Sequence, residues 1–519
     1  MKKSFRGKLT AGLAALGVAC SLQPTFASDA HMSMPRTVIT TDGEVDDMNS
    51  IIRALLYSNE MDITGIVLTS STYHYAGDMA SGVAPYRWTG TDWIYHYLDD
   101  YEKVYPNLIK HDPNFQTADY FRKHTHIGNI TNVGEMDKVT DGSEYLKQLF
   151  LDDDPRTLYV QTWGGTNTTA RALKSIEEEY KGTPQWDSIR EKLSNKLFLY
   201  IILDQDSSYN DYIAKNWSNL KVVNDRCNFW HFAYEWLNHE ENVNTTLRAD
   251  WNKKNILNNG PLMEHYALMD DGRWIEGELP YEQRGQGYIE RYPAYAKYDF
   301  ISEGDSPSFL YLANNGLRSY ENPSYGGWGG RFGDFNGNRA INDALDYNPV
   351  NQRYESVYSL TRWFDDMQNE FAARADWCVA NEYSKANHAP TVTVKEGIDI
   401  SAIPGQKVTL HAQATDPDGD ELAYHWWRYF EADTYQDEKR ELPQIKNVER
   451  DGLLLNMTRE LLPEEKLNTI KLNGANSDTV SFTVPEDAIS GNTIHIILEV
   501  QDNGEHHLKR YQRVVVTVK

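Results

Sequence analysis

Acidic side chains crowd one short stretch near the start of the chain, where Asp42, Glu44, Asp46 and Asp47 lie within six residues. Carboxylates held this close repel one another unless protons or a cation separate them. Their oxygens are hard ligands, so a divalent ion such as Ca²⁺ is the natural occupant. As an alternative, Asp46 and Asp47 cap a helix and complement its dipole. Capping explains neither Asp42 nor the clustering, so the stretch predicts a site for one cation.

A strand and a helix are expected to position these acids. The β-branched run at residues 37–41 is typical of a buried parallel strand, and apolar residues recur at helical spacing from Met48 to Leu56. The acids then occupy a strand-to-helix turn. In a parallel α/β sheet such turns lie at the carboxyl ends of the strands, where these sheets bind their ligands.

Three later apolar runs predict further strands, at residues 63–69, 157–162 and 197–203, and each leads into polar residues. The polar residues that follow these strands are His74, Asn167, Gln205, Asp206 and Asn210. Strand, helix and strand within about thirty residues form a βαβ unit, so the strand ends should meet at one edge. Two alternatives stay open. His74 could be a histidine of a surface loop, and Gln205, Asp206 and Asn210 could belong to a turn that caps the next helix.

A glycine-rich run later in the chain, residues 325–333, surrounds Trp328 and Arg331. Glycines let the backbone approach a ligand, an indole offers a flat face to a sugar ring, and a guanidinium binds hydroxyls or a carboxylate. The alternative is a flexible loop without a ligand. The run is therefore a candidate part of a sugar-binding surface.

The acidic turn resembles the N-terminal fingerprint of the inosine-uridine nucleoside hydrolases, Asp-x-Asp-Pro-Gly-x-Asp-Asp. In that family the aspartates hold Ca²⁺, and the second one is the base that takes a proton from water. The resemblance places Asp42 at the base and Asp46 and Asp47 at the closing pair. Thr40 stands where the family has its first Asp, and Gly43-Glu44 stands where it has Pro-Gly.

Two other segments extend this resemblance. Trp163, before Gly164-Gly165, matches the residue whose main-chain oxygen binds Ca²⁺, and Asp305 matches the late Asp that completes the ion's shell. Gly304 replaces the His that serves the substrate in the family. An acid for the leaving group would then have to be Glu303 or Asp206.

The order of these segments is similar to an exported branch of the superfamily, the nucleoside-hydrolase-like proteins described as cellulose-binding, with a C-terminal β domain. The similarity covers nearly all of residues 35–519. It implies an α/β fold, with a mostly parallel sheet flanked by helices, followed by an immunoglobulin-like β-sandwich.

The sequence itself predicts a domain boundary near Asn387, where helical spacing gives way to alternation. The expected domains are the nucleoside-hydrolase-like unit at 35–387, closed by a helix over 354–379, and an antiparallel immunoglobulin-like or PKD-like sandwich at 388–519. Because neighbours on a strand face opposite sides, one of Trp426 and Trp427 should lie in the sandwich core. The other could stack on sugar or contact the large domain.

Residues 1–27 have the basic start, apolar middle and small-residue end of a signal peptide, which predicts a periplasmic or extracellular protein. A lipoprotein modified at Cys20 is the second interpretation. Loss of the four basic residues of this segment takes the formal net charge from −25 to −29, which argues against nucleic acid as a partner. No later run is long and apolar enough for a membrane span. Cys227 and Cys378 could form one disulfide or remain free and buried.

Together these observations predict an exported, Ca²⁺-dependent hydrolase of O- or N-glycosyl bonds in a glycan or glycoside, with its oligomeric state open. Asp42 would be the base, and Asp42, Asp46, Asp47, Asp305 and the Trp163 carbonyl would hold one ion. A non-catalytic protein that binds cellulose or another polysaccharide is the rival, and action on nucleosides is a third possibility. The expected substrate contacts are His74, Asn167, Gln205, Asp206, Asn210, Glu303, Trp328 and Arg331.

Overall fold

A computed structural model describes residues 34–273, 275, 277–278, 289, 293–436, 443–461 and 467–519. The predicted signal segment, with Cys20, lies outside these residues. No helix of the described chain has the length and apolar character that a membrane crossing requires. Both Cys227 and Cys378 are free and buried, so the second of the two expectations for them holds.

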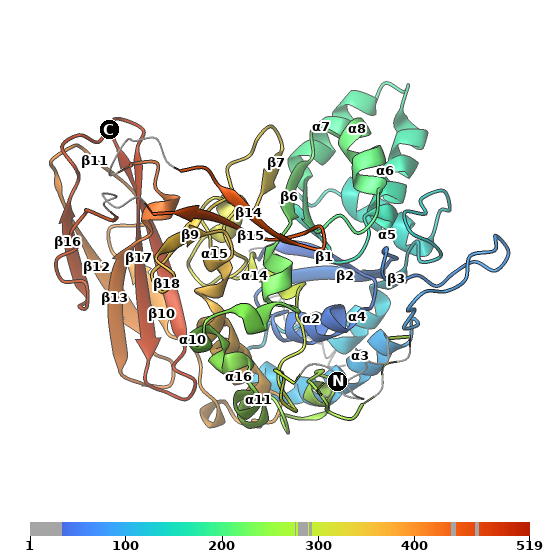
Figure 1. Cartoon of the computed structure of the whole chain (residues 1–519), viewed down its shortest axis with the longest axis horizontal. Coiled ribbons are helices and arrows are strands. Elements are labelled where there is room, and N and C mark those ends of the chain that lie inside the picture. Colours follow the sequence, from blue (N-terminus) through green and yellow to red (C-terminus); the bar gives the residue numbers. More distant parts are fainter. Residues whose placement is uncertain are drawn as a thin grey trace, which may run out of the picture.

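Seven parallel strands form the sheet of the large domain, in the order β3-β2-β1-β4-β5-β6-β7 (Figure 1). Their bounds are β1 Arg36–Thr41, β2 Asp62–Leu68, β3 Thr125–Ile127, β4 Leu158–Thr162, β5 Leu197–Ile202, β6 Lys221–Asp225 and β7 Arg339–Ile341. The predicted fold class is confirmed. The central strand, β1, pairs with β2 on one side and β4 on the other, so its carboxyl end lies in the middle of the sheet edge.

Helices cover both faces of this sheet, which is why all six residues of β1 are buried. Val38 faces a core with α5 (Asp141–Leu151), α6 (Asn167–Tyr180) and α7 (Trp186–Lys196). Ile39 faces the opposite core, with α2 (Val45–Leu56), α3 (Trp93–His111) and α16 (Phe364–Trp377).

The remaining helical elements are short. They are α4 Ala118–Lys123, η1 Tyr209–Ile213, α8 Ala214–Asn216, α9 Asn228–His231, η2 Trp236–Asn238, α10 Glu241–Asn244, η3 Thr245–Leu247, α11 Ala249–Asn255, α12 Pro261–Glu264, α14 Ser306–Leu310, η4 Ser319–Glu321, α15 Tyr358–Thr361, η5 Tyr383–Lys385 and η6 Phe430–Ala432.

Two packed sheets form the C-terminal sandwich. One contains β10 (Thr391–Val394), β12 (Lys407–Thr415) and β16 (Thr479–Thr483), and the other β11 (Asp399–Ala402), β18 (Lys509–Val518), β17 (Thr493–Asp502) and β13 (Leu422–Arg428). The expectation of a purely antiparallel sandwich is wrong in one place, because β11 pairs with β18 in parallel. Trp426 lies in the sandwich core, whereas Trp427 packs 6.1 Å from Trp363 of the large domain.

A fourth sheet joins the two parts of the chain, in the order β14-β15-β9-β8. A hairpin of β14 (Lys446–Arg450) and β15 (Leu453–Glu460) leaves the C-terminal part and pairs with β9 (Arg353–Glu355), which pairs with β8 (Asp346–Asn348) (Figure 1). The helix expected over 354–379 is therefore shorter, since its first residues belong to β9. A division of the chain at residues 387 and 388 stays a prediction, because strands from both sides of it share this sheet.

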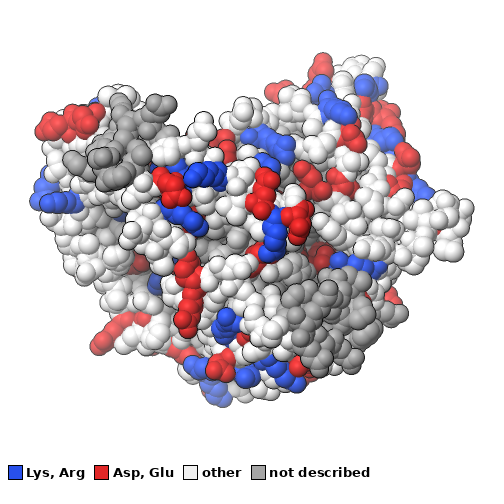
Figure 2. All heavy atoms as spheres, viewed as in Figure 1, with Lys and Arg blue, Asp and Glu red and all other residues white. Residues whose placement is uncertain are grey.

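On the face of the molecule in Figure 2, basic and acidic side chains are intermixed, and they form no continuous basic patch on that face.

Candidate active site

Asp42 follows β1 directly, on a tight turn that leads into α2. Gly43 has a φ of +77°, and a Cβ there would lie 2.8 Å from Thr89 Oγ1, so the turn requires glycine. The carboxylate of Asp47 accepts hydrogen bonds from the Thr41 hydroxyl and, at 3.2 Å, from the Asp42 amide. Within the described chain no side chain caps the start of α2, so capping does not explain Asp46 and Asp47.

Asp305 begins α14 and, although distant in sequence, lies beside the acids of the first turn. One carboxylate oxygen from each of Asp46, Asp47 and Asp305 lies within 4.8 Å of the others. Both oxygens of Asp305, Oδ1 of Asp46 and Oδ2 of Asp42 are buried and have no hydrogen-bond partner among the described residues. Buried carboxylates without partners are costly, so protons or a cation must compensate them. The donor set fits a hard divalent cation.

Burial raises the pKa of Asp46 well above its usual range, and the charges of Glu44, Asp305 and Asp42 raise it further. Burial raises the pKa values of Asp47 and Asp305 in the same way, with neighbouring carboxylates adding to the effect. Since a cation would have to displace these protons, its affinity should increase with pH.

Trp163 and its two glycines bring the end of β4 against these acids. A Cβ on Gly164 would lie 2.9 Å from Asp42 Cβ, so only glycine allows this approach. The Trp163 indole donates to Ser308 Oγ on α14 at 2.8 Å, and the Trp163 carbonyl accepts from the Gln205 side-chain amide. A metal role for this carbonyl stays a prediction.

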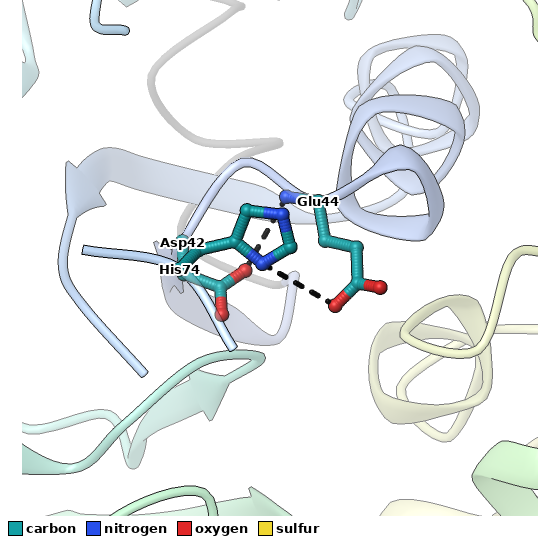
Figure 3. A group of neighbouring side chains, drawn as sticks. All are labelled: Asp42, Glu44 and His74. Carbon is teal, nitrogen blue, oxygen red and sulfur yellow. Dashed lines mark hydrogen bonds and ion pairs between the residues drawn. The ribbon is translucent and has the colours of Figure 1, made fainter. Parts of the chain in front are cut away.

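A second polar group lies beside Asp42. Figure 3 shows the imidazole of His74 next to Glu44, with Nδ1 3.5 Å from a Glu44 oxygen, while the Glu44 amide donates to Asp42 Oδ1 at 3.3 Å. On its other side, Nε2 of His74 lies 3.1 Å from Glu278, and Arg87 bridges Glu44 and Glu278 at 3.1 and 2.7 Å. His74 is fully buried, so it is not a surface-loop histidine.

The charges of this group are set by its pairing. Burial alone would lower the pKa of His74, but the charge of Glu44 and the hydrogen bond to Glu278 raise it to about 9. Burial raises the pKa of Glu44. Burial would also raise the pKa of Glu278, but the hydrogen bond and charge of His74 and the charge of Arg87 outweigh burial and lower this pKa to about 2. His74 is thus a buried imidazolium between carboxylates.

A cavity of about 190 Å³ opens onto both acidic groups. Its lining is largely aromatic and consists of Glu44, Asp46, Asp47, Tyr73, Arg87, Trp163, Leu203, Gln205, Phe229, Trp230 and Tyr234. The volume is below the roughly 300–1,000 Å³ of sites for drug-sized ligands, so the cavity suits one small ring. Carbohydrate rings combine apolar faces with hydroxyls, which matches a lining of aromatic and charged residues.

Comparisons with known proteins identify the family of the chain and a similar fold. A family model described as "Cellulose-binding Sde182, nucleoside hydrolase-like domain" matches residues 36–332, and "Cellulose-binding protein Sde0182, C-terminal domain" matches residues 407–518. The chain belongs to this Sde182 family. A similar solved structure is a nucleoside hydrolase-related hypothetical protein from Saccharophagus degradans, described as associated with carbohydrate metabolism. It has 26% sequence identity and a TM-score of 0.66 over 94% of this chain and 100% of that chain.

More distant structures include a plant nucleoside hydrolase, PpNRh1, with 12% identity and a TM-score of 0.28 over 59% of this chain and 86% of that chain. The type III effector XopQ, complexed with adenosine diphosphate ribose, has 9% identity and a TM-score of 0.31 over 69% of this chain and 99% of that chain. Neither likeness is close enough to carry an argument. A search of curated proteins gave no match.

Three predicted substrate contacts of this Sde182-family chain, Asp206, Asn167 and Asn210, are not among the residues that line the cavity. Asp206 accepts from the Asn167 backbone amide at 3.0 Å and from the Thr166 hydroxyl at 2.9 Å, so it caps the start of α6 and not the next helix along the chain. Asn167 is buried, and its side-chain amide donates to Ser70 Oγ at 2.9 Å. Asn210 is exposed on η1. We correct the assignments of Asp206 and Asn167 to structural roles, and Asn210 is not part of the cavity lining, whereas Gln205 does line the cavity.

Three further expectations are corrected by burial and pairing. Glu303 is fully buried and pairs with Arg53 at 2.5 Å, so it is not available to a leaving group. Trp328 is also fully buried and meets the Tyr511 ring edge-on at 6.5 Å, which leaves no face for a sugar. Arg331 pairs with Asp346 at 2.7 Å and lines a different cavity of about 540 Å³.

Gly304 stands where the resemblance to nucleoside hydrolases would place a histidine, and an aromatic ring fills the space beside it. A Cβ on Gly304 would lie 2.3 Å from the ring of Phe229, which also lines the cavity. Phe229, Trp230 and Tyr234 line the cavity but are not among the residues that the sequence analysis selected. Arg87 was missed as well, since it lies in a stretch without periodicity. We found no sequence signal that would have selected these residues.

Proposed function

We propose that the protein is an exported, metal-dependent hydrolase of glycosidic bonds that acts on a single sugar ring at the end of a glycan or in a glycoside. The observation that carries this proposal is the cluster of Asp46, Asp47 and Asp305, because Asp46 and Asp47 also line a cavity of about 190 Å³ with an aromatic wall. The cavity has room for one ring, which favours a chain end over the middle of a polysaccharide.

Asp46, Asp47 and Asp305 would form the core of a site for one Ca²⁺, because one oxygen of each lies within 4.8 Å of the others, and Asp46 Oδ1 and both Asp305 oxygens have no partner among the described residues. Asp42, which lies in a neighbouring group with Glu44 and His74, and the Trp163 carbonyl are added as ligands from the family resemblance. A bound Ca²⁺ would supply the positive charge that neutralises these acids and polarises oxygen ligands beside the sugar.

Asp42 is the proposed base. Its Oδ1 accepts a hydrogen bond from the Glu44 amide, and its Oδ2 is buried without a partner among the described residues, which leaves that oxygen free to accept a proton from water in the proposed reaction. The hydroxide would bond to the anomeric carbon as the bond from that carbon to the leaving group breaks and positive charge develops on the sugar, and the leaving group would take its proton from solvent, since Glu303 and Asp206 are both engaged.

The charge of the site restricts the substrate. Six carboxylates, on Asp42, Asp46, Asp47, Asp305, Glu44 and Glu278, lie in this region, and two basic side chains of the described residues, Arg87 and His74, pair with them. Even with a divalent cation added, the formal charge stays negative. We therefore propose neutral glycosides as substrates, since sugars that carry carboxylates or phosphates would be repelled.

A second function, non-catalytic binding of cellulose or another polysaccharide, is favoured by a separate observation. Both candidate leaving-group acids, Glu303 and Asp206, are engaged in buried structural contacts. A site without such an acid could hold a sugar without cleaving it. The family description as cellulose-binding supports this alternative.

Asp42→Asn separates the two functions. Hydrolysis of a panel of aryl furanosides, aryl pyranosides, nucleosides and cello-oligosaccharides is measured in Ca²⁺ and in EDTA, and cellobiose affinity is measured by calorimetry. The matched control is Asp204→Asn, an exposed acid that follows β5 at the same edge of the sheet. For the hydrolase we expect Asp42→Asn to lower turnover by roughly 10²–10⁴-fold with affinity retained. Binding without turnover in the wild-type protein supports the polysaccharide-binding function instead.

Export is proposed from the sequence of residues 1–27. Mass spectrometry of protein from the native host should show cleavage after Ala27; a mature chain that begins at a lipid-modified Cys20 would indicate the lipoprotein instead.

A further inference from the structure

We propose that the hairpin of β14 and β15 positions the aromatic wall of the cavity, so that the C-terminal part of the chain is a working component of the site. This inference rests on the proposed function, in that it takes the 190 Å³ cavity as the sugar site. Leu455, Asn456 and Met457 act as positioning residues, because they contact the segments behind the cavity wall.

The hairpin is fixed to the large domain by backbone and side-chain contacts. Thr458 and Arg459 pair with Glu355 and Tyr354 of β9. The Ser356 amide donates to the Met457 carbonyl at 2.9 Å, and the Ser356 hydroxyl donates to Asn456 Oδ1 at 3.1 Å. The hairpin therefore has one defined register against the large domain.

From this register the hairpin covers α9 and the residue before it. Cys227 precedes α9, is fully buried and packs against Leu454 and Met457. His231, at the end of α9, hydrogen-bonds through Nε2 to the Leu455 carbonyl. Close to the tip of the hairpin, Arg450 forms an ion pair with Glu235. These contacts hold both ends of α9 and the turn after it.

The side chains of α9 form the cavity wall. Phe229 and Trp230 line the cavity, and the Phe229 ring lies over Gly304, next to Asp305. The Phe232 carbonyl, just after α9, accepts from the Glu303 backbone amide at 2.9 Å. This hydrogen bond connects the end of α9 to the segment that contains Asp305. A helix of four residues has no stability of its own, so the position of its aromatic rings depends on what packs against it.

Met457→Ala tests this role, because it removes the side chain that covers Cys227. Val448→Ala is the matched control, since Val448 lies on the same hairpin and is 43% exposed. Met457→Leu should restore the wild-type behaviour, since it refills the volume. Asn456→Ala is a second variant that loosens the hairpin if Met457→Ala does not fold.

Two measurements are made in the full-length protein without its signal segment, in a Cys378→Ser background. The first is the rate at which an aromatic disulfide reagent modifies the Cys227 thiol, and the second is cellobiose affinity, with KM and kcat for any active substrate. We expect Met457→Ala to expose the thiol and to weaken cellobiose binding or raise KM by roughly 10- to 100-fold, with a smaller change in kcat. Val448→Ala and Met457→Leu should match the wild type.

The two proposals fail differently. A wild-type protein that neither binds nor cleaves any sugar overturns the proposed function. It also overturns the role of the hairpin in sugar binding, at any measured rate of Cys227 modification. A sugar-binding wild type whose Met457→Ala and Asn456→Ala variants keep a protected thiol and unchanged affinity overturns the hairpin role alone. A reactive thiol with unchanged affinity also overturns it, since the hairpin would then cover α9 without positioning the wall.

Discussion

Replacement of Asp305 by Asn gives the sharpest test of the acidic cluster, because it changes charge with little change in shape. Asp305 takes part in two of the three close pairs among Asp46, Asp47 and Asp305, whose oxygens lie within 4.8 Å of one another. Two unit charges at that distance repel by about 3.5 kcal/mol at an effective dielectric constant of about 20. Protonation relieves part of this repulsion, so we expect Asp305→Asn to stabilise the Ca²⁺-free protein by roughly 2–4 kcal/mol.

Ca²⁺ should offset most of this effect. A ligand at a hundred times its Kd stabilises the folded protein by about 2.7 kcal/mol, and the variant should lose most of this gain because it lacks one ligand. The wild type should therefore be the less stable protein in EDTA and gain more from Ca²⁺ than the variant does. Calorimetric unfolding in EDTA and in saturating Ca²⁺ measures both differences, with Asp204→Asn as the control.

The pH dependence follows from the direction of the pKa shifts. Burial and neighbouring charges raise the pKa values of Asp46, Asp47 and Asp305 in the folded state, so without a cation the folded protein binds more protons than the unfolded one. Its stability in EDTA should then fall as pH rises above the ordinary range of an Asp carboxyl, and Ca²⁺ should suppress this fall. Wild-type protein that shows no Ca²⁺-dependent stabilisation at any pH, or a variant that keeps all of it, refutes the metal cage.

Two other variants test the groups around the cage. Glu303→Gln should destabilise the fold by about 3–5 kcal/mol, because Arg53 would keep its buried charge without a charged partner; urea denaturation measures this, and a loss below 1 kcal/mol contradicts the structural assignment of Glu303. His74 has a pKa raised to about 9, so its pairing should contribute stability that is complete below pH 6.5 and is lost as pH rises through about 9. NMR titration of the imidazole in the Glu278→Gln variant should show a lower pKa than in the wild type, and an unchanged value would show that Glu278 does not hold the charge.

Four of the seven strands of the sheet, β1, β2, β4 and β5, were predictable because each is a buried run of β-branched or apolar residues, whereas β3, β6 and β7 were not predicted. The runs at 37–41 and 197–203 are buried on both faces, and such runs leave a strong local signal. The approach of Asp305 to Asp46 could be expected only from the family resemblance, since no local pattern links residues so far apart. The short strand β9 could not be expected, because the partner that makes it a strand, β15, lies about a hundred residues later.

The glycine-rich run shows why composition misled at the site. Its glycines do allow a close approach, but the approach is to protein: a Cβ on Gly329 would lie 2.6 Å from the Pro307 carbonyl and from Tyr311 Cβ. Trp328 is buried by the same packing, against the C-terminal part of the chain. A mixture of Gly, Trp and Arg is as suitable for an interface inside the protein as for a sugar, and only the tertiary contacts distinguish the two.

Gly304, Phe229 and the hairpin are parts of one arrangement. The Phe229 ring occupies the space above Gly304, so a histidine cannot stand at this position while the ring stays where it is. The ring belongs to α9, which is held from behind by Cys227, Met457 and Leu455. An apolar face beside the carboxylates can stack on a sugar but cannot donate a proton. On the proposed function, the C-terminal hairpin and the glycine at position 304 therefore act in the same direction, because both favour holding a neutral ring over protonating a nucleobase.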